Sequence, residues 1–278
     1  MLEKFIFENH LGQRFDGLAN KVFLNYNDLR DYAWSYETIN SRISRFYRSV
    51  KSRKLPLVVC GETDEAATDA KNRLLELAEA DIEAVLPGKI YIGEYYTTGF
   101  ITASAKSKYL LTKRYSEIDL SFTSSDPAWY REQTHVFNKS NGDGESGKMG
   151  SGTDYPYNYP FDYAVSTKMR QIVCNTIKAN KFKIRIYGEA TNPSITIAGH
   201  TYSVEGMIKA GESLLIDSVN KTITLTTATG AKINWFDKRN RESYIFEPIP
   251  AGINTVSYNG TFGFDLTVVE ERSEPKWI

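Results

Sequence analysis

The sequence predicts a mostly β protein with two domains: an N-terminal, β-rich α+β domain with one helix, and a C-terminal β-sandwich. Several short runs alternate apolar and polar residues with a period of two, as half-buried strands do. Turn residues separate these runs at intervals typical of a sandwich, and only one segment has helical periodicity. At 278 residues the chain is longer than one hydrophobic core usually serves, which favours two domains.

The first domain, residues 1–137, begins with short apolar runs that suit strands and loops. Phe5 and Phe7 form the first run, and Val22, Phe23 and Leu24 form the second. Residues 55–60 read as a buried strand that ends at Gly61. Between them, residues 32–43 mix aromatic and polar side chains, and this segment is assigned to no element.

One helix is predicted over residues 63–82. Thr63 or Asp64 caps its N-terminus, acidic residues fill its first turn, and the apolar residues share one face. The helix ends before Pro87, and strands are expected at residues 89–93, 99–103 and 115–122. Strands on both sides of a lone helix indicate an α+β domain with the helix packed on a sheet.

Residues 138–162 interrupt this pattern and are predicted to be a linker or long loop that begins the second domain, residues 138–278. Residues 142–148 match G-x-x-x-x-G-K, but Met149 stands where a phosphate-binding loop needs a Ser or Thr, and no helix follows. Asp143 and Glu145 also lack the spacing of a calcium loop. We therefore interpret the segment as a solvated loop.

Residues 182–226 contain the clearest strands of the chain. Apolar side chains alternate with polar ones in three runs: Ile184 and Ile186, Ile195 and Ile197, and Ile223 and Leu225. Turn residues lie between the runs, which predicts the body of a sandwich. Further strands of this domain are expected near residues 233–236, 245–246 and 262–269.

The composition predicts neither nucleic-acid nor membrane binding, because 34 basic residues balance 34 acidic ones. Cys60 and Cys174 lack paired spacing and adjoin apolar runs, so both are expected to be buried free thiols. The N-terminus has no secretory h-region, and no apolar run is long enough to span a membrane. We expect the protein to fold in a reducing cytoplasm.

No motif predicts catalysis, a metal site or a cofactor. His10, His135 and His200 are far apart in sequence, and the metalloprotease, CxxC and nucleophile-elbow motifs are absent from the sequence. Carboxylates such as Asp119 and Asp126 show no spacing that marks a pair for acid–base work. The expectation is a protein that is not an enzyme.

A basic run and a set of aromatic residues leave several interpretations open. Residues 42–54 carry six cations and no acid, which suits a solvated face, a nucleic-acid surface or a contact between subunits. Tyr187, Tyr202, Trp235 and Tyr244 suit core or edge packing, or a platform on which sugars stack.

Residues 115–132, YSEIDLSFTSSDPAWYRE, resemble the distal tail protein (Dit) family of long-tailed, non-contractile bacteriophages, where a strand is followed by Asp-Pro-x-Trp. The resemblance continues, in family order, through residues 155–163, 184–197, 211–223 and 251–260. It covers most of the chain as short motifs, but the first forty residues carry none that map onto the family.

The resemblance implies a structural hub at the tip of the phage tail. The N-terminal domain would form a homohexameric ring that joins the major tail tube protein to the tail-associated tip protein. The C-terminal domain would be galectin-like or carbohydrate-binding-module-like and would project outward, in some members supporting receptor-binding proteins. On this interpretation Arg42, Arg45, Arg48 and Lys51 are expected in the ring lumen or at an interface.

The alternative function is a lectin that binds host cell-wall carbohydrate through Tyr202, Trp235 and Tyr244. An enzyme that acts on the cell wall is the least favoured hypothesis. No contact with specific nucleic-acid sequences and no membrane contact is expected.

Overall fold

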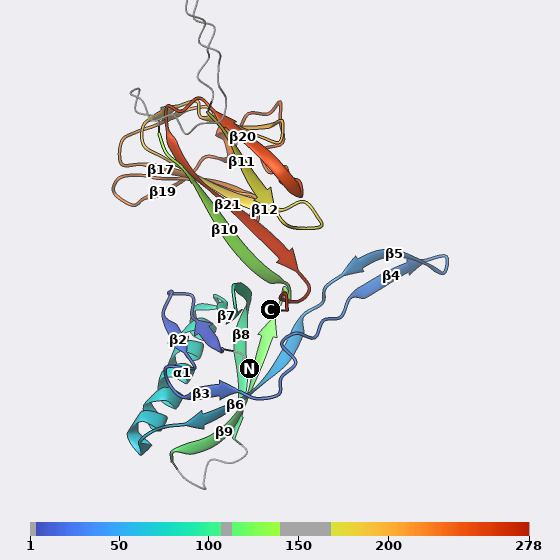
Figure 1. The fold of residues 1–278 in the computed structure, drawn as a ribbon, viewed down its shortest axis with the longest axis vertical. Coiled ribbons are helices and arrows are strands. Elements are labelled where there is room, and N and C mark those ends of the chain that lie inside the picture. The colour runs from blue at the N-terminus through green and yellow to red at the C-terminus, as the bar shows by residue number, and fades with distance from the viewer. Residues whose placement is uncertain (1–3, 107–112, 140–167, 278) are drawn as a thin grey trace, which may run out of the picture. The chain divides into compact units, whose positions relative to one another are not determined.

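The computed structural model describes residues 4–106, 113–139 and 168–277 (Figure 1). The chain divides into two compact units, residues 1–131 with 271–278, and residues 132–270. Both divisions fall within a strand: the chain enters the second unit within the strand Trp129–Phe137 and leaves it within the strand Gly263–Arg272. The expected boundary after residue 137 differs from this division, and the sequence did not indicate the return of residues 271–278 to unit 1.

Within its described residues, unit 1 contains the first ten strands and one α-helix, and the tenth strand continues into unit 2. The elements are β1 (Ile6–Glu8), β2 (Arg14–Asp16), β3 (Val22–Leu24), β4 (Ser35–Ile39), β5 (Arg42–Tyr47), β6 (Lys51–Cys60), α1 (Asp64–Ala84), β7 (Gly88–Ile92), β8 (Tyr95–Lys106), β9 (Tyr115–Ser124) and β10 (Trp129–Phe137).

Strand β8 connects the two sheets of unit 1. Its first half, Tyr95 to Gly99, pairs with β7, which continues the order to β1 and β2. Its second half pairs with β9, which is followed by β6 and β3. Helix α1 places Ala67, Leu74 and Leu77 in the hydrophobic core, and Thr63 caps it by accepting a hydrogen bond from Ala66 N. The predicted helix and its cap are confirmed.

Unit 2 is a sandwich of two antiparallel sheets. Its remaining elements are β11 (Lys168–Cys174), β12 (Lys181–Tyr187), β13 (Ala190–Thr191), β14 (Ser194–Ile197), β15 (His200–Ser203), β16 (Met207–Ile208), β17 (Ser213–Asp217), β18 (Thr222–Thr226), β19 (Lys232–Asn234), the 3-10 turn η1 (Phe236–Lys238), β20 (Gly252–Tyr258) and β21 (Gly263–Arg272). One sheet has the order β19-β18-β17-β12-β21-β10 and the other β11-β20-β14-β15.

The core of unit 2 lies between these sheets because alternate residues of each strand face inward. Ile184 and Ile186 of β12, Ile195 and Ile197 of β14, and Ile223 and Leu225 of β18 are all buried, as the period-two pattern predicts. The mostly β fold class is therefore confirmed.

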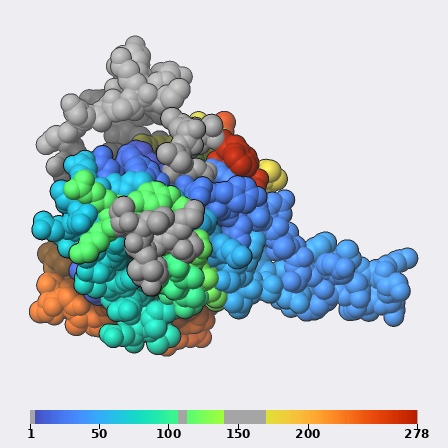
Figure 2. Space-filling model, turned by 90° about the horizontal axis from the view of Figure 1, so that it is seen from below, coloured from blue at the N-terminus to red at the C-terminus, as the bar shows by residue number. Residues whose placement is uncertain are grey.

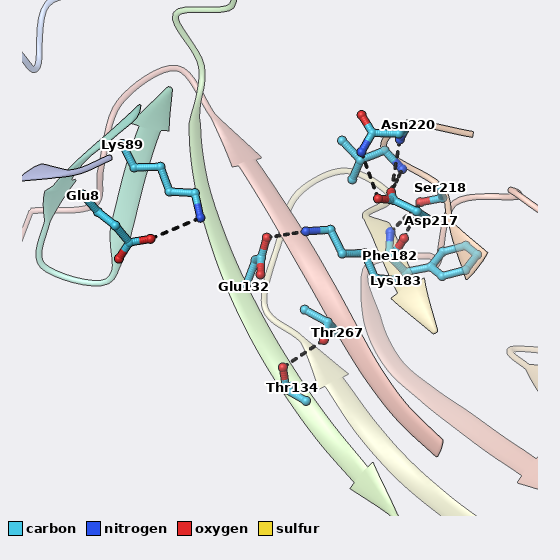
Figure 3. A network of polar contacts seen from close by, with 11 residues as sticks. Glu8, Lys89, Glu132, Thr134, Phe182, Lys183, Asp217, Ser218, Asn220 and Thr267 are labelled. Carbon is cyan, nitrogen blue, oxygen red and sulfur yellow. Dashed lines mark hydrogen bonds and ion pairs between the residues drawn. The ribbon is translucent and has the colours of Figure 1, made fainter. Parts of the chain in front are cut away.

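Polar contacts fix the strands that carry the chain into and out of unit 2 (Figure 3). Lys183 Nζ donates to Glu132 Oε1 over 2.8 Å, and the hydroxyls of Thr134 and Thr267 lie 2.9 Å apart. These bonds tie the neighbouring strands β10, β21 and β12 together. Phe182 N, at the start of β12, donates to Ser218 Oγ over 2.6 Å. Because Ser218 directly follows β17, this hydrogen bond links the turn after β17 to the start of β12.

The expectation for the cysteines is half right. Cys174 is buried, and burial raises the pKa of its thiol. Cys60 is exposed, because burial alternates along β6 and this last residue points to the outer side of the strand. In the described part of the chain, no helix is long and apolar enough to cross a membrane.

Candidate functional site

The strands β4 and β5 form a two-stranded hairpin, called the arm from here on, that projects from unit 1 (Figure 1). Figure 2 shows the arm extending away from the body of the unit. Asn40 and Ser41 form its tip with positive φ angles of 49° and 62°, the geometry of a tight type I′ reversal. The first strand and the tip of the arm lie in residues 32–43, to which the sequence assigned no element, and its second strand, β5, lies in the basic run of residues 42–54.

The arm is almost wholly exposed yet carries large apolar side chains. Every residue of β5 is exposed, and Ile39, Ile43 and Phe46 are exposed by 65%, 54% and 57%. A two-stranded hairpin without a sheet or helix beneath it is marginally stable in water. On one face of the arm, Phe46 lies opposite Tyr36 with the ring centroids 6.5 Å apart, and exposed apolar side chains that gather in this way mark a contact site for another protein.

The structure separates the basic run into cations with different environments. Arg42 and Arg45 are exposed on β5 and form no ion pair within the described residues. Lys51 Nζ donates to the carbonyl of Asp31 over 2.7 Å, and burial together with neighbouring Arg53 lowers the pKa of Lys51. The run therefore forms no continuous basic face of the kind that would track a nucleic-acid backbone.

Arg48 fastens the base of the arm. Its Nη1 lies 2.8 Å from Glu271 Oε1, in a pair whose side chains are 14% and 15% exposed. The guanidinium also lies 4.5 Å from the centre of the Trp34 ring, just before β4, and 3.9 Å from Asp126 Oδ1. One side chain thus joins both ends of the arm to the last residues of unit 1 and to the Asp-Pro-x-Trp segment.

Arg53 supports the Asp-Pro-x-Trp segment from inside the core. Its side chain is fully buried, Nη2 donates to the carbonyl of Pro127 over 2.9 Å, and the guanidinium lies 5.9 Å from the centre of the Trp129 ring. Burial lowers the pKa of Arg53. Next to it, the Tyr130 hydroxyl donates to Asp126 Oδ2, and burial and that bond raise the pKa of Tyr130. The Asp-Pro-x-Trp segment therefore packs in the core of unit 1, and its Asp126 contacts Arg48 at the base of the arm.

The different environments of Arg48 and Arg45 predict different effects on stability. Arg48→Ser is expected to destabilise monomeric unit 1 by about 1–3 kcal/mol, because it removes the ion pair with the largely buried Glu271 carboxylate and the contact with the Trp34 ring. Arg45→Ser serves as the control and is expected to change stability by less than about 0.5 kcal/mol. Urea unfolding at low protein concentration measures both, and equal effects would contradict the anchoring role of Arg48.

The three aromatic residues expected to face sugar do not form one platform. Tyr202 is 2% exposed, and its hydroxyl donates to the carbonyl of Glu247 over 2.7 Å. Trp235 packs against the core of unit 2, whereas Tyr244 is 52% exposed. Only Tyr244 presents a substantial part of its ring to solvent, so a shared stacking surface is not formed.

The other chemistry-bearing residues show no clustered site. His10 Nδ1 lies 2.7 Å from buried Asp81 Oδ1, and His200 Nε2 donates to the carbonyl of Tyr244. Within residues 4–106, 113–139 and 168–277, no group of three or more acidic, histidine or cysteine side chains is placed to hold a metal ion. The Gly142 to Lys148 segment with its acids lies outside the described residues.

Comparison with known proteins identifies the fold. No protein-family model matches the chain, and no curated protein matches it by sequence. Among solved structures, the Dit protein of phage SPP1, described as a paradigm of the hub adsorption apparatus in phages that infect Gram-positive bacteria, matches with a TM-score of 0.56 and 12% identity. That match covers 96% of this chain and 99% of that one.

Two structures of the phage P2 baseplate in its activated conformation, one with calcium and one with strontium, match more extensively. Each has a TM-score of 0.60 and 13% identity, and each match covers 99% of this chain and 100% of the baseplate chain. The chain therefore has the fold of these phage tail hub and baseplate proteins over nearly its whole length.

Proposed function

We propose that this protein, which has the fold of phage tail hub and baseplate proteins, is the structural hub of a phage tail tip. Six copies would form a ring through unit 1, which would join the major tail tube protein to the tail-associated tip protein. The observation that carries this proposal is the fold likeness, because it covers nearly the full length of both chains and includes both units. The protein would then reside at the tail tip of the virion after folding in the host cytoplasm.

The arm supplies the contact that the ring requires. A closed ring of identical subunits is built from one heterologous contact repeated around an axis, so each copy needs a donor surface and a different acceptor surface. The arm is suited to be the donor, because its exposed isoleucines and Phe46 contribute nothing to the core of its own unit. Arg42 and Arg45 would lie at this interface, and Arg48 and Lys51 at its base.

A lectin is not favoured as the main function. Burial of Tyr202 and packing of Trp235 remove two of the three aromatic residues on which that hypothesis depends. Unit 2 is accordingly proposed as an accessory domain that supports receptor-binding proteins. The mass of the assembled protein in solution tests the hub function, because a ring of six copies has six times the mass of one chain.

A further inference from the structure

A groove of about 430 Å³ lies in unit 1, between the C-terminal half of α1 and the second half of β8. Both elements line it with apolar side chains, among them Ile82 of α1 and Ile101 of β8. Glu79 and Glu83 also line the groove, whereas no cation does so in the part of the chain that the structure describes. Since Ile82 is 45% exposed, the groove presents an apolar surface to solvent beside two acids.

The two acids of the groove lie where the helix itself disfavours them. Glu79 and Glu83 are four residues apart, so they lie on the same side of α1 and repel each other. Glu83 is in the last turn and Glu79 in the turn before it, where the helix dipole favours cations, and the last turn contains no basic residue. Within the described residues neither acid forms an ion pair. Residues that oppose their own element in this way are expected at functional surfaces.

The residue that follows the helix is strained as well. Val85 has φ 54° and ψ 34°, the left-handed conformation in which helices usually end on glycine. A β-branched side chain is disfavoured there, because its Cβ approaches the following carbonyl oxygen too closely. Val85 and Leu86 are nonetheless 76% and 51% exposed and do not belong to the core of unit 1. Exposed apolar side chains next to a strained residue indicate a surface that a partner covers.

The arm has the opposite charge. Ile39 and Ile43 near its tip are more than half exposed. Arg42 and Arg45 form no ion pair with any described residue. Glu37 is the one acid of β4 and β5 and lies opposite Arg45 across the hairpin, so the two strands carry one net positive charge. Complementary charges on two exposed apolar surfaces favour contact between them and select the partner.

We propose that this groove is the acceptor surface for the arm of a second copy of the chain. The inference rests on the proposed ring, in which every contact needs a donor surface and a different acceptor surface. Ile39 and Ile43 would pack on the apolar lining of the groove, and Arg42 would meet its two acids. Figure 1 shows the arm and α1 on opposite sides of unit 1, so the arm of one copy would reach the groove of the next.

Charge reversal, with light scattering in the presence of the major tail tube protein, tests the proposal. The arm charge variant combines Arg42→Glu with Arg45→Ser, and the groove charge variant combines Glu79→Arg with Glu83→Arg. Each variant alone is expected to weaken the contact between two copies at least about ten-fold, because like charges then face each other. An equimolar mixture of the two is expected to assemble, since alternation of the variants around a ring of six copies pairs every arm with a groove of opposite charge.

The matched control is Asp119→Arg, which reverses an exposed acid of β9 in a second groove of unit 1 that Lys54 also lines. This variant is expected to assemble as the wild type does. The groove charge variant is expected to unfold at the same temperature as the wild type or at a higher one, because it removes a repulsion within α1. Its loss of assembly would therefore report the contact and not the fold.

The outcomes separate this proposal from the ring itself. If the groove charge variant assembles as the wild type does, or if the mixture of the two variants stays unassembled, the groove is not the acceptor although the ring stands. A groove charge variant that still forms the ring but no longer binds the tube protein would assign the groove to the tube protein instead. Failure of the wild-type chain to assemble with the tube protein would overturn the ring, and this proposal with it.

Discussion

Replacement of Ile39, Ile43 and Phe46 by serine is expected to leave the monomer folded and to abolish ring assembly. All three side chains are more than half exposed, so the variant removes almost nothing from the core of unit 1. In a ring each of these side chains would be buried against a neighbouring copy. Loss of that burial is expected to weaken the free energy of each contact between two copies by about 3 kcal/mol or more. The association constant for each contact would fall at least about 100-fold.

Light scattering and thermal unfolding together measure this effect. The matched control replaces Ile177, Met207 and Ile253 by serine, because these unit 2 side chains are also more than half exposed but lie outside the arm. The control is expected to assemble as the wild type does. If the arm variant forms the same assembly as the control, the arm is not the contact between subunits.

Trp129→Ala is expected to destabilise unit 1 by about 3–5 kcal/mol, the largest effect of a single substitution that we predict. The side chain is fully buried, so its removal leaves a large cavity in the core. The indole ring also covers the buried guanidinium of Arg53, which would be left with less packing around its charge. Urea unfolding followed by circular dichroism gives the change in the free energy of unfolding.

Trp277→Ala is the control for this variant. Trp277 belongs to the same unit, is 73% exposed, and contacts Arg30, whose guanidinium lies 4.1 Å from the centre of its ring. Loss of that contact is expected to cost about 1 kcal/mol or less. An effect of Trp129→Ala no larger than that of Trp277→Ala would show that the Asp-Pro-x-Trp segment does not support the core.

The regular elements could be predicted from the sequence because their cause is local. Ile118, Leu120 and Phe122 alternate with polar residues, and the structure buries all three on one side of β9. Helix α1 was predicted from Thr63 at its cap and from the spacing of its apolar residues, and it ends at Ala84, close to the expected position. In each case the spacing of the apolar residues indicates which side of the strand or helix faces the hydrophobic core.

The arm could not be found by the same argument, because neither of its faces is buried in its own unit. Its residues therefore show no alternation between core and solvent positions. A weaker signal was available: Asn40-Ser41 lies between two runs that are rich in Tyr, Ile, Phe and Thr, as expected for the turn of a hairpin. The sequence therefore provided only weak evidence for the hairpin that carries the proposed contact between subunits.

The roles of the arginines depend on partners that are distant in the chain. Arg48 pairs with Glu271, and Arg53 bonds to Pro127, so no local pattern distinguishes them from the exposed Arg42 and Arg45. The sequence identified the whole run as one candidate surface. The structure divides it into an exposed part on the arm, a paired residue at its base and a buried residue in the core.

The mass of the purified protein in solution, alone and mixed with the major tail tube protein, tests the central claim most directly. Since a ring can need its partner in order to assemble, the mixture is the decisive sample. In the mixture, light scattering is expected to show a complex that contains six copies of the 31.5 kDa chain. A chain that remains monomeric at high concentration with the tube protein present would contradict the proposal that it is the ring-forming hub of a tail tip.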